Sequence, residues 1–346
     1  MKKVFLAAVL SLLLAIPVNA SELVAPEVQK SGQLLMPQNT DSFGDGLFEL
    51  LQNSLKLLRP DFQEATASCG TVILSAMLFS VLPMISQRIH SMAAVAGAVS
   101  IAAVMFQQTN SLILLATDTV RNILEYGKLL CQVMTAALAA QGGVTESSAL
   151  YIGTTVFITV LNSLMSTLMI PLIFGYLVFS VAHGAFGEEF LKKAADLIKS
   201  SMIWVLKTLL VAFTTYMSVT GAVNGSTDLA ALKTAKVVIS SAVPVVGGIL
   251  SDSSEAVLLS MGVIKNAAGI YGMLAVLSVF MGPFVKIGVH YLLLKISAVI
   301  CSVFGDKQVS ALADSFSSAM SLLLAVIAAG CVLVLISTVC FLKGAG

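Results

Sequence analysis

The sequence has 346 residues, of which 58% are hydrophobic and 11% are charged. Soluble domains carry about 25% charged residues, so this chain has too little polar material to cover a water-soluble fold. The formal net charge of +1 gives no electrostatic attraction for nucleic acid or for a strongly acidic partner. The composition therefore indicates a protein embedded in the lipid bilayer.

Residues 1–20, MKKVFLAAVLSLLLAIPVNA, combine two lysines, an apolar run and a small-residue ending. This order is typical of a secretory signal peptide, here cleaved after Ala20, which would place the mature N-terminus outside the cytoplasm. An uncleaved first span is the alternative. Residues 21–64 are polar and are expected to form an extracytoplasmic tail with one amphipathic helix at 48–58. Residues 65–346 are then a polytopic membrane domain.

Within that domain, runs without Asp, Glu, Lys or Arg mark the candidate spans, because a crossing helix needs about 20 mostly apolar residues. These runs cover 65–87, 89–117, 147–187, 208–227, 266–285 and 315–342. The run 147–187 is long enough for one tilted span, or for two that turn near Asn162 or break at Pro171. A kink or break is also expected at Pro283. The sequence thus predicts an all-α integral membrane protein with about six to eight membrane segments plus amphipathic interfacial helices.

A charged helix face is predicted between the second and third runs. Asp118, Arg121, Glu125 and Lys128 are spaced three and four residues apart, so they share one side of a helix and neighbours can pair. One interpretation is an interfacial helix with a solvated stripe, and the other is a polar face turned to a partner or a pore. Residues 183–201 predict a second amphipathic helix, whose lysines favour the cytoplasmic side.

The segment 237–251 is uncharged over a length too short for an ordinary crossing and contains Pro244, Gly247 and Gly248. These residues weaken a straight helix. Irregular backbone at membrane depth persists only where protein or water satisfies it. We therefore expect a re-entrant or tightly packed element within 237–272.

Asp252 and Glu255 follow as a capping-box-like helix start, which alone explains both carboxylates. The next helix would carry Gly262, Lys265, Gly269 and Gly272 on a glycine-rich face. Small residues allow close helix approach in lipid, and an intramembrane lysine faces a partner as a rule. Tight packing and direct action in transport are the two interpretations of this face.

Signatures of enzymes are absent from the sequence. It contains no Walker lysine loop, no HExxH motif and no nucleophile elbow, so we expect no catalytic residue, cofactor or metal. The five cysteines form no CxxC pair and are expected to act as small buried hydrophobes. Their positions are Cys69, Cys131, Cys301, Cys331 and Cys340.

The stretch VPVVGGILSDSSEAVLLSMGVIKNAAG, at 243–269, resembles the stage III sporulation protein AE family of endospore-forming bacteria. The resemblance is carried by Pro244, Gly247, Gly248, Ser251, Asp252, Glu255, Lys265, Asn266 and Gly269. It implies a multi-pass protein of the mother-cell membrane around the forespore, where it would be the membrane core of a channel or secretion-like complex joining the two cells.

The same resemblance implies partners: the other stage III sporulation proteins A, including an ATPase and ring-forming subunits, and protein Q from the forespore. A stand-alone secondary transporter is the alternative function, although no second interrupted segment pairs with 237–251 as such transporters show. A third possible function is that of a scaffold, which would assemble the complex without conducting any solute.

Overall fold

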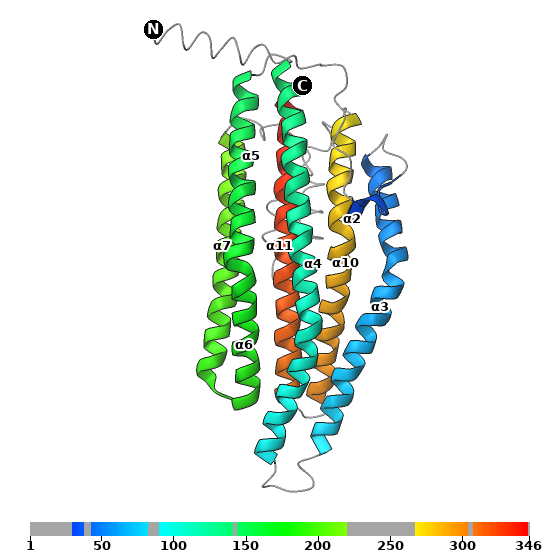
Figure 1. The fold of residues 1–346 in the computed structure, drawn as a ribbon, viewed down its shortest axis with the longest axis vertical. Coiled ribbons are helices and arrows are strands. Elements are labelled where there is room, and N and C mark those ends of the chain that lie inside the picture. The colour runs from blue at the N-terminus through cyan, green and yellow to red at the C-terminus, as the bar shows by residue number, and fades with distance from the viewer. Residues whose placement is uncertain are drawn as a thin grey trace.

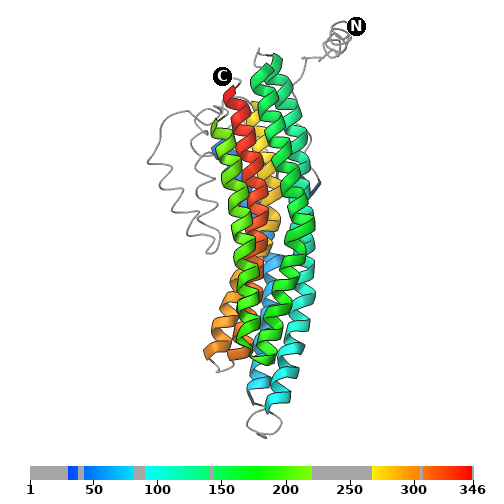
Figure 2. The ribbon, with the colours of Figure 1, turned by 90° about the vertical axis from the view of Figure 1, so that its left-hand side faces the viewer.

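The computed structural model describes residues 30–37, 43–81, 90–140, 144–219, 267–303 and 307–344. Its elements are α2 (Lys30–Gln33), α3 (Phe43–Val81), α4 (His90–Ala140), α5 (Val144–Leu164), the π-helix η2 (Met165–Met169), α6 (Ile170–Phe186), α7 (Glu189–Val219), α10 (Ala267–Val303) and α11 (Lys307–Gly344). These ranges contain no strand, which confirms the predicted all-α fold. The long helices lie side by side along one axis (Figures 1 and 2).

Five helical stretches among the described residues are long and apolar enough to cross a membrane. They are Val99–Ala136, Ser147–Phe186, Glu189–Met217, Gly269–Val303 and Val309–Leu342. This confirms a multi-pass α-helical architecture. The expected total of six to eight segments stays a prediction, and the predicted signal peptide at 1–20 lies outside the described residues.

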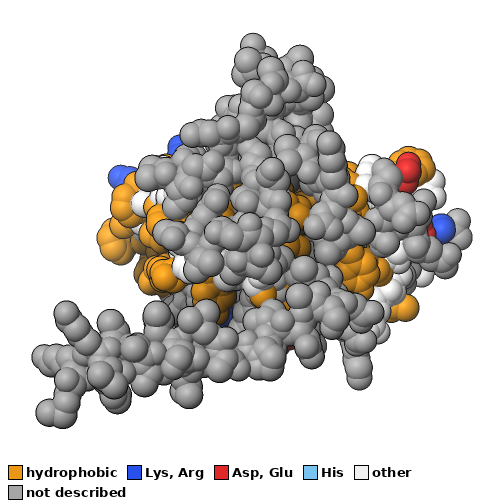
Figure 3. All heavy atoms as spheres, turned by 90° about the horizontal axis from the view of Figure 1, so that it is seen from above, with side chains coloured by type: hydrophobic (Ala, Val, Ile, Leu, Met, Phe, Trp, Pro, Cys, Tyr) orange, Lys and Arg blue, Asp and Glu red, His pale blue; other side chains and the backbone are white. Residues whose placement is uncertain are grey.

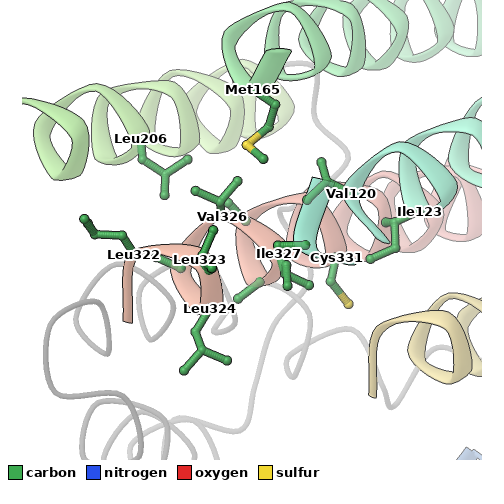
Figure 4. Close-up of a cluster of buried hydrophobic side chains, with 14 of the residues drawn as sticks. Val120, Ile123, Met165, Leu206, Leu322, Leu323, Leu324, Val326, Ile327 and Cys331 are labelled. Carbon is green, nitrogen blue, oxygen red and sulfur yellow. The ribbon is translucent and has the colours of Figure 1, made fainter. Parts of the chain in front are cut away.

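The C-terminal helix α11 is the centre of the bundle. Every residue from Phe316 to Leu342 is buried, and the helix packs against α10, α4, α6, α5 and α7. Figure 4 shows Val120 of α4, Met165 of η2 and Leu206 of α7 around the α11 side chains. A helix that is apolar on all sides fits only where other parts of the protein or lipid surround it, and five of the described helices pack against α11.

The long apolar run at 147–187 forms one continuous helical rod instead of turning near Asn162 or breaking at Pro171. α5 passes through the five-residue π-helix η2 directly into α6, and Pro171 stands in the first turn of α6. Because proline has no backbone N–H, a regular helix would lose a hydrogen bond there. The wider π turn accommodates this irregularity without ending the rod.

The break or kink expected at Pro283 does not end α10, which continues as a helix to Val303. Neighbouring helices stabilise proline-containing membrane helices by holding the chain on either side. α10 packs against both α11 and α3, and these contacts support it past the proline.

Segments expected to be separate amphipathic helices are instead parts of longer ones. Residues 48–58 belong to α3, residues 118–128 to the middle of α4, and residues 189–201 to the first part of α7. Charges interrupt the apolar runs in the sequence, but they fall on one face only. The buried face continues past them, so the helix continues too.

The outer surface of the bundle is largely apolar. Viewed along the long axis, hydrophobic side chains predominate in the described part of the surface (Figure 3). Exposed examples include Ile152 and Val156 on α5, Val178 on α6, and Trp204 and Val211 on α7. Such a surface is suited to lipid, since a water-soluble monomer rarely exposes large contiguous apolar areas.

The tight enclosure of α11 predicts an overpacking effect. Ala329→Leu should lower the free energy of unfolding by about 1–3 kcal/mol, because Ala329 is fully buried and added methylenes strain a filled core. Thermal unfolding in detergent can be followed with a thiol-reactive fluorophore, since all five native cysteines are buried. Val211→Leu, at a position 51% exposed, is the control. Equal melting temperatures for both variants would contradict the enclosure.

Candidate functional site: close helix contacts and polar groups of the bundle

The central motif predicted from sequence lies mostly outside the described residues. This holds for Pro244, Gly247, Gly248, Asp252, Glu255, Gly262, Lys265 and Asn266. Gly269 is described, and it lies in the first turn of α10. The site can therefore be examined from Gly269 onward, together with the charged face of α4.

Gly269 lies directly against the end of the central helix. A Cβ atom placed on Gly269 would be 2.5 Å from Leu342 Cδ1, closer than real Cβ contacts permit. One turn further, a Cβ on Gly272 would be 2.9 Å from Leu130 Cδ1 of α4. Because these two glycines have no side chains, α10 can approach both α11 and α4 closely. This agrees with the tight-packing interpretation of the glycine-rich face.

A glycine of α4 completes the same junction. A Cβ on Gly127 would lie 2.6 Å from Cγ2 and 3.0 Å from Cγ1 of Val334 on α11. Valine has one strongly preferred rotamer in a helix, so it cannot swing away. Gly127, Gly269 and Gly272 therefore join α4, α10 and α11 into one closely packed unit. Gly269 and Gly272 belong to the glycine-rich face expected from the sequence. Gly127 was not singled out, because its partner Val334 is far away along the chain.

The predicted polar helix face lies on the outer side of this unit. Asp118, Arg121 and Glu125 are exposed, and Lys128 is partly exposed. The adjacent positions Val120, Leu124 and Tyr126 are buried. The same helix thus joins the core with one side and carries four charges on the other. No ion pair joins two of the four charged residues in the described ranges.

Polar side chains also occur inside the bundle, around a small cavity between α3, α4, α10 and α11. Its lining consists of Cys69, Met105, Gln108, Thr109, Leu112, His290, Leu294 and Met320. His290 is buried, and its Nδ1 lies 2.9 Å from the carbonyl oxygen of Lys286. Because a carbonyl oxygen only accepts, Nδ1 is the donor in this contact. The hydrogen bond to its own helix favours a packing role for this histidine.

At the opposite end of the bundle from Gly269, polar contacts link the helices. Lys295 of α10 pairs with Asp314 of α11, and Lys199 of α7 donates to Ser318 of α11 at 3.1 Å. The Ser317 hydroxyl donates to the carbonyl oxygen of Tyr291 at 3.2 Å. These contacts fix the register of α11 at the point where its apolar stretch begins.

The cysteines occupy the positions expected of small hydrophobes. All five are buried, and none of them forms a disulfide: Cys69, Cys131, Cys301, Cys331 and Cys340. His183, at the end of α6, contacts the carbonyl oxygen of Glu188 through Nδ1 at 2.9 Å. This contact closes the turn at Gly187, whose φ of 72° lies in the left-handed region that favours glycine. The turn reverses the chain between α6 and α7.

Together these features define a multi-pass α-helical membrane protein whose core is one wholly enclosed helix. A comparison with protein families matches residues 37–345 to the family described as stage III sporulation protein AE. The chain belongs to this family, as its central motif had suggested.

A curated relative is the stage III sporulation protein AE of Bacillus subtilis (strain 168). It is 24% identical over 213 residues, which are 62% of this chain and 53% of the relative. The chain thus spans about half the length of that curated relative. No solved structure matches the chain.

The glycine junction predicts a position-specific effect. Gly127→Ala should lower the free energy of unfolding by about 1–3 kcal/mol, because the new methyl group would overlap the stiff Val334 side chain. Gly288→Ala is a matched control on α10, where nothing lies within 4 Å of the added methyl group. Thermal unfolding of both variants in detergent makes the comparison. A Gly127 variant as stable as the Gly288 variant would refute the close approach of α4 and α11.

Proposed function

We propose that this protein is the membrane core component of a multi-protein channel or secretion-like complex between mother cell and forespore, needed for forespore development. Membership of the stage III sporulation protein AE family carries this proposal. The family assignment supports a role in sporulation, and the bundle of apolar helices supports a place within a membrane. The membrane around the forespore on the mother-cell side is its proposed location.

The packing of the described helices bears on where a conduit could run. The middle of the bundle is filled by α11, whose residues from Phe316 to Leu342 are buried and mostly apolar. A solute path through the centre of the described helices would have to displace that helix. The conduit we propose therefore runs beside this bundle, bordered by it together with other subunits.

The proposed partners are the other stage III sporulation proteins A, including an ATPase and ring-forming subunits, and the forespore protein Q. The sequence has no Walker lysine loop, so a separate subunit would supply energy from nucleotide hydrolysis. We propose that the protein itself catalyses no reaction. Its task would be to hold membrane helices and partner subunits in fixed positions.

Within this role, residues 244–266 are the proposed working segment, and Gly269 would anchor it. The contact between Gly269 and Leu342 holds the start of α10 against the central helix. In this proposal Asp252, Glu255 and Lys265, which lie outside the described residues, would act on a partner or on the transported solute.

Deletion of the gene tests the function directly, with sporulating cells followed by microscopy and a late forespore reporter. The expected result is normal growth and engulfment, followed by forespores that shrink or stay silent. Normal spores combined with a growth defect on a particular nutrient would instead indicate a stand-alone secondary transporter. That result would overturn the proposal.

Complementation then tests the working segment. The triple variant Asp252→Ala, Glu255→Ala and Lys265→Ala should accumulate in membranes but fail to restore the reporter. The matched control is Glu188→Ala, Glu189→Ala and Lys193→Ala, which also removes two acids and one lysine, all exposed near the turn between α6 and α7. If the first variant fully restores the forespore reporter, residues 244–266 are not the working segment.

A further inference from the structure

The charged face of α4 is part of a longer polar stripe. Its exposed or partly exposed members recur at alternating intervals of four and three residues, the spacing of a coiled-coil seam. The members are Gln107, Ser111, Leu114, Asp118, Arg121, Glu125, Lys128 and Gln132. At 1.5 Å per residue the stripe is about 37 Å long, enough to cross the hydrocarbon core of a bilayer. We call these eight residues the α4 stripe.

The α4 stripe lies at the height of the apolar belt of the bundle. A Cβ on Gly330 of α11 would lie 3.7 Å from Val120 of α4 and 3.9 Å from Leu161 of α5, so these two residues are level. Next to Leu161, α5 exposes Val160 and Val156, which suit acyl chains. At the same height, α4 exposes Asp118, Arg121 and Glu125.

Lipid is a poor environment for this stripe. A charged side chain at the centre of a membrane helix costs about 2.5–3.5 kcal/mol on insertion scales. Charges at such depth therefore face protein or water as a rule. The eight-residue stripe is narrow, and its heptad spacing matches the contact seam of one packed helix.

The order of charges along the α4 stripe indicates which kind of surface can pack against it. Asp118, Arg121, Glu125 and Lys128 alternate in sign and sum to zero. A partner surface of one sign would repel half of them. A second α4 stripe offers both signs at the same spacing. In a parallel pair identical residues lie at the same level, and the steps of three and four residues let the long side chain of Arg121 in one copy reach between Asp118 and Glu125 of the other.

We propose that two copies of this chain pack against each other along their α4 stripes, with a two-fold axis along the bundle. Both copies then keep the same orientation in the membrane, and each contact occurs twice, as two-fold symmetry requires. Gln107, Ser111 and Gln132 supply uncharged hydrogen-bonding groups at the two ends of the seam. This inference rests on the stripe alone and does not depend on the proposed role in sporulation.

Cysteine cross-linking in native membranes tests the pairing with full-length protein. Ser111→Cys and Gln132→Cys should each give a product of twice the mass of the chain with a short bifunctional maleimide. The control is Val211→Cys, exposed on α7, which should stay monomeric, as should the parent protein with its buried cysteines. No product at either stripe position, or equal product at Val211, would overturn the proposal. Cross-linking of the stripe to a protein of another mass would also overturn it.

Charge inversion separates a second copy from a different partner. Asp118→Lys, Arg121→Glu, Glu125→Arg and Lys128→Asp together reverse every sign but keep the alternation, so the cross-link through Ser111→Cys should persist. Arg121→Glu with Lys128→Glu makes the stripe wholly acidic and should reduce the cross-link at least tenfold. If the fully inverted variant also loses the cross-link, the stripe faces a surface of fixed charge and not a second copy.

Discussion

The enclosure of α11 is the constraint on which the rest of the structure depends. A helix that is apolar on every side from Phe316 to Leu342 has to be covered on every side. α4 and α10 pack against it most extensively, and α5, α6 and α7 also pack against it. In lipid, such packing is driven by close contact rather than by exclusion of water. This explains why Gly127 and Gly269, which have no side chains to hold the helices apart, lie at the contacts with α11.

This arrangement divides the polar groups of the protein by location. Inside the bundle, His290 donates a hydrogen bond to the carbonyl oxygen of Lys286 on its own helix. The charges of α4 instead lie on the outside of the single chain. A protein that fills its own centre and presents a charged face on the outside of α4 is suited to act within an assembly. The proposed roles at a conduit and at a two-fold interface both use the outer faces.

Much of the fold was predicted correctly from the sequence. The helix boundaries that were predicted wrongly have a common cause. The last span was predicted at 315–342 because nothing interrupts its apolar run, and it lies within α11. Charges at 118–128 and the proline at 283 were taken as boundaries, yet both lie inside continuous helices. One-sided charge and a laterally supported proline do not end a helix, and that support comes from residues distant in sequence. Val334, the partner of Gly127, is one of these distant residues, so the close contact of Gly127 with α11 was not predictable from local pattern, although the glycine-rich face that includes Gly269 was.

The most direct test of the enclosed helix is fluorescence quenching by brominated lipids. The sequence has a single tryptophan, Trp204, which is 66% exposed on α7, whereas Phe341 of α11 is 1% exposed. In liposomes, Trp204 should be strongly quenched. A variant carrying Trp204→Phe and Phe341→Trp should be quenched little at any bromine position along the acyl chain. Equal quenching of the two proteins would show that α11 contacts lipid and would contradict the account.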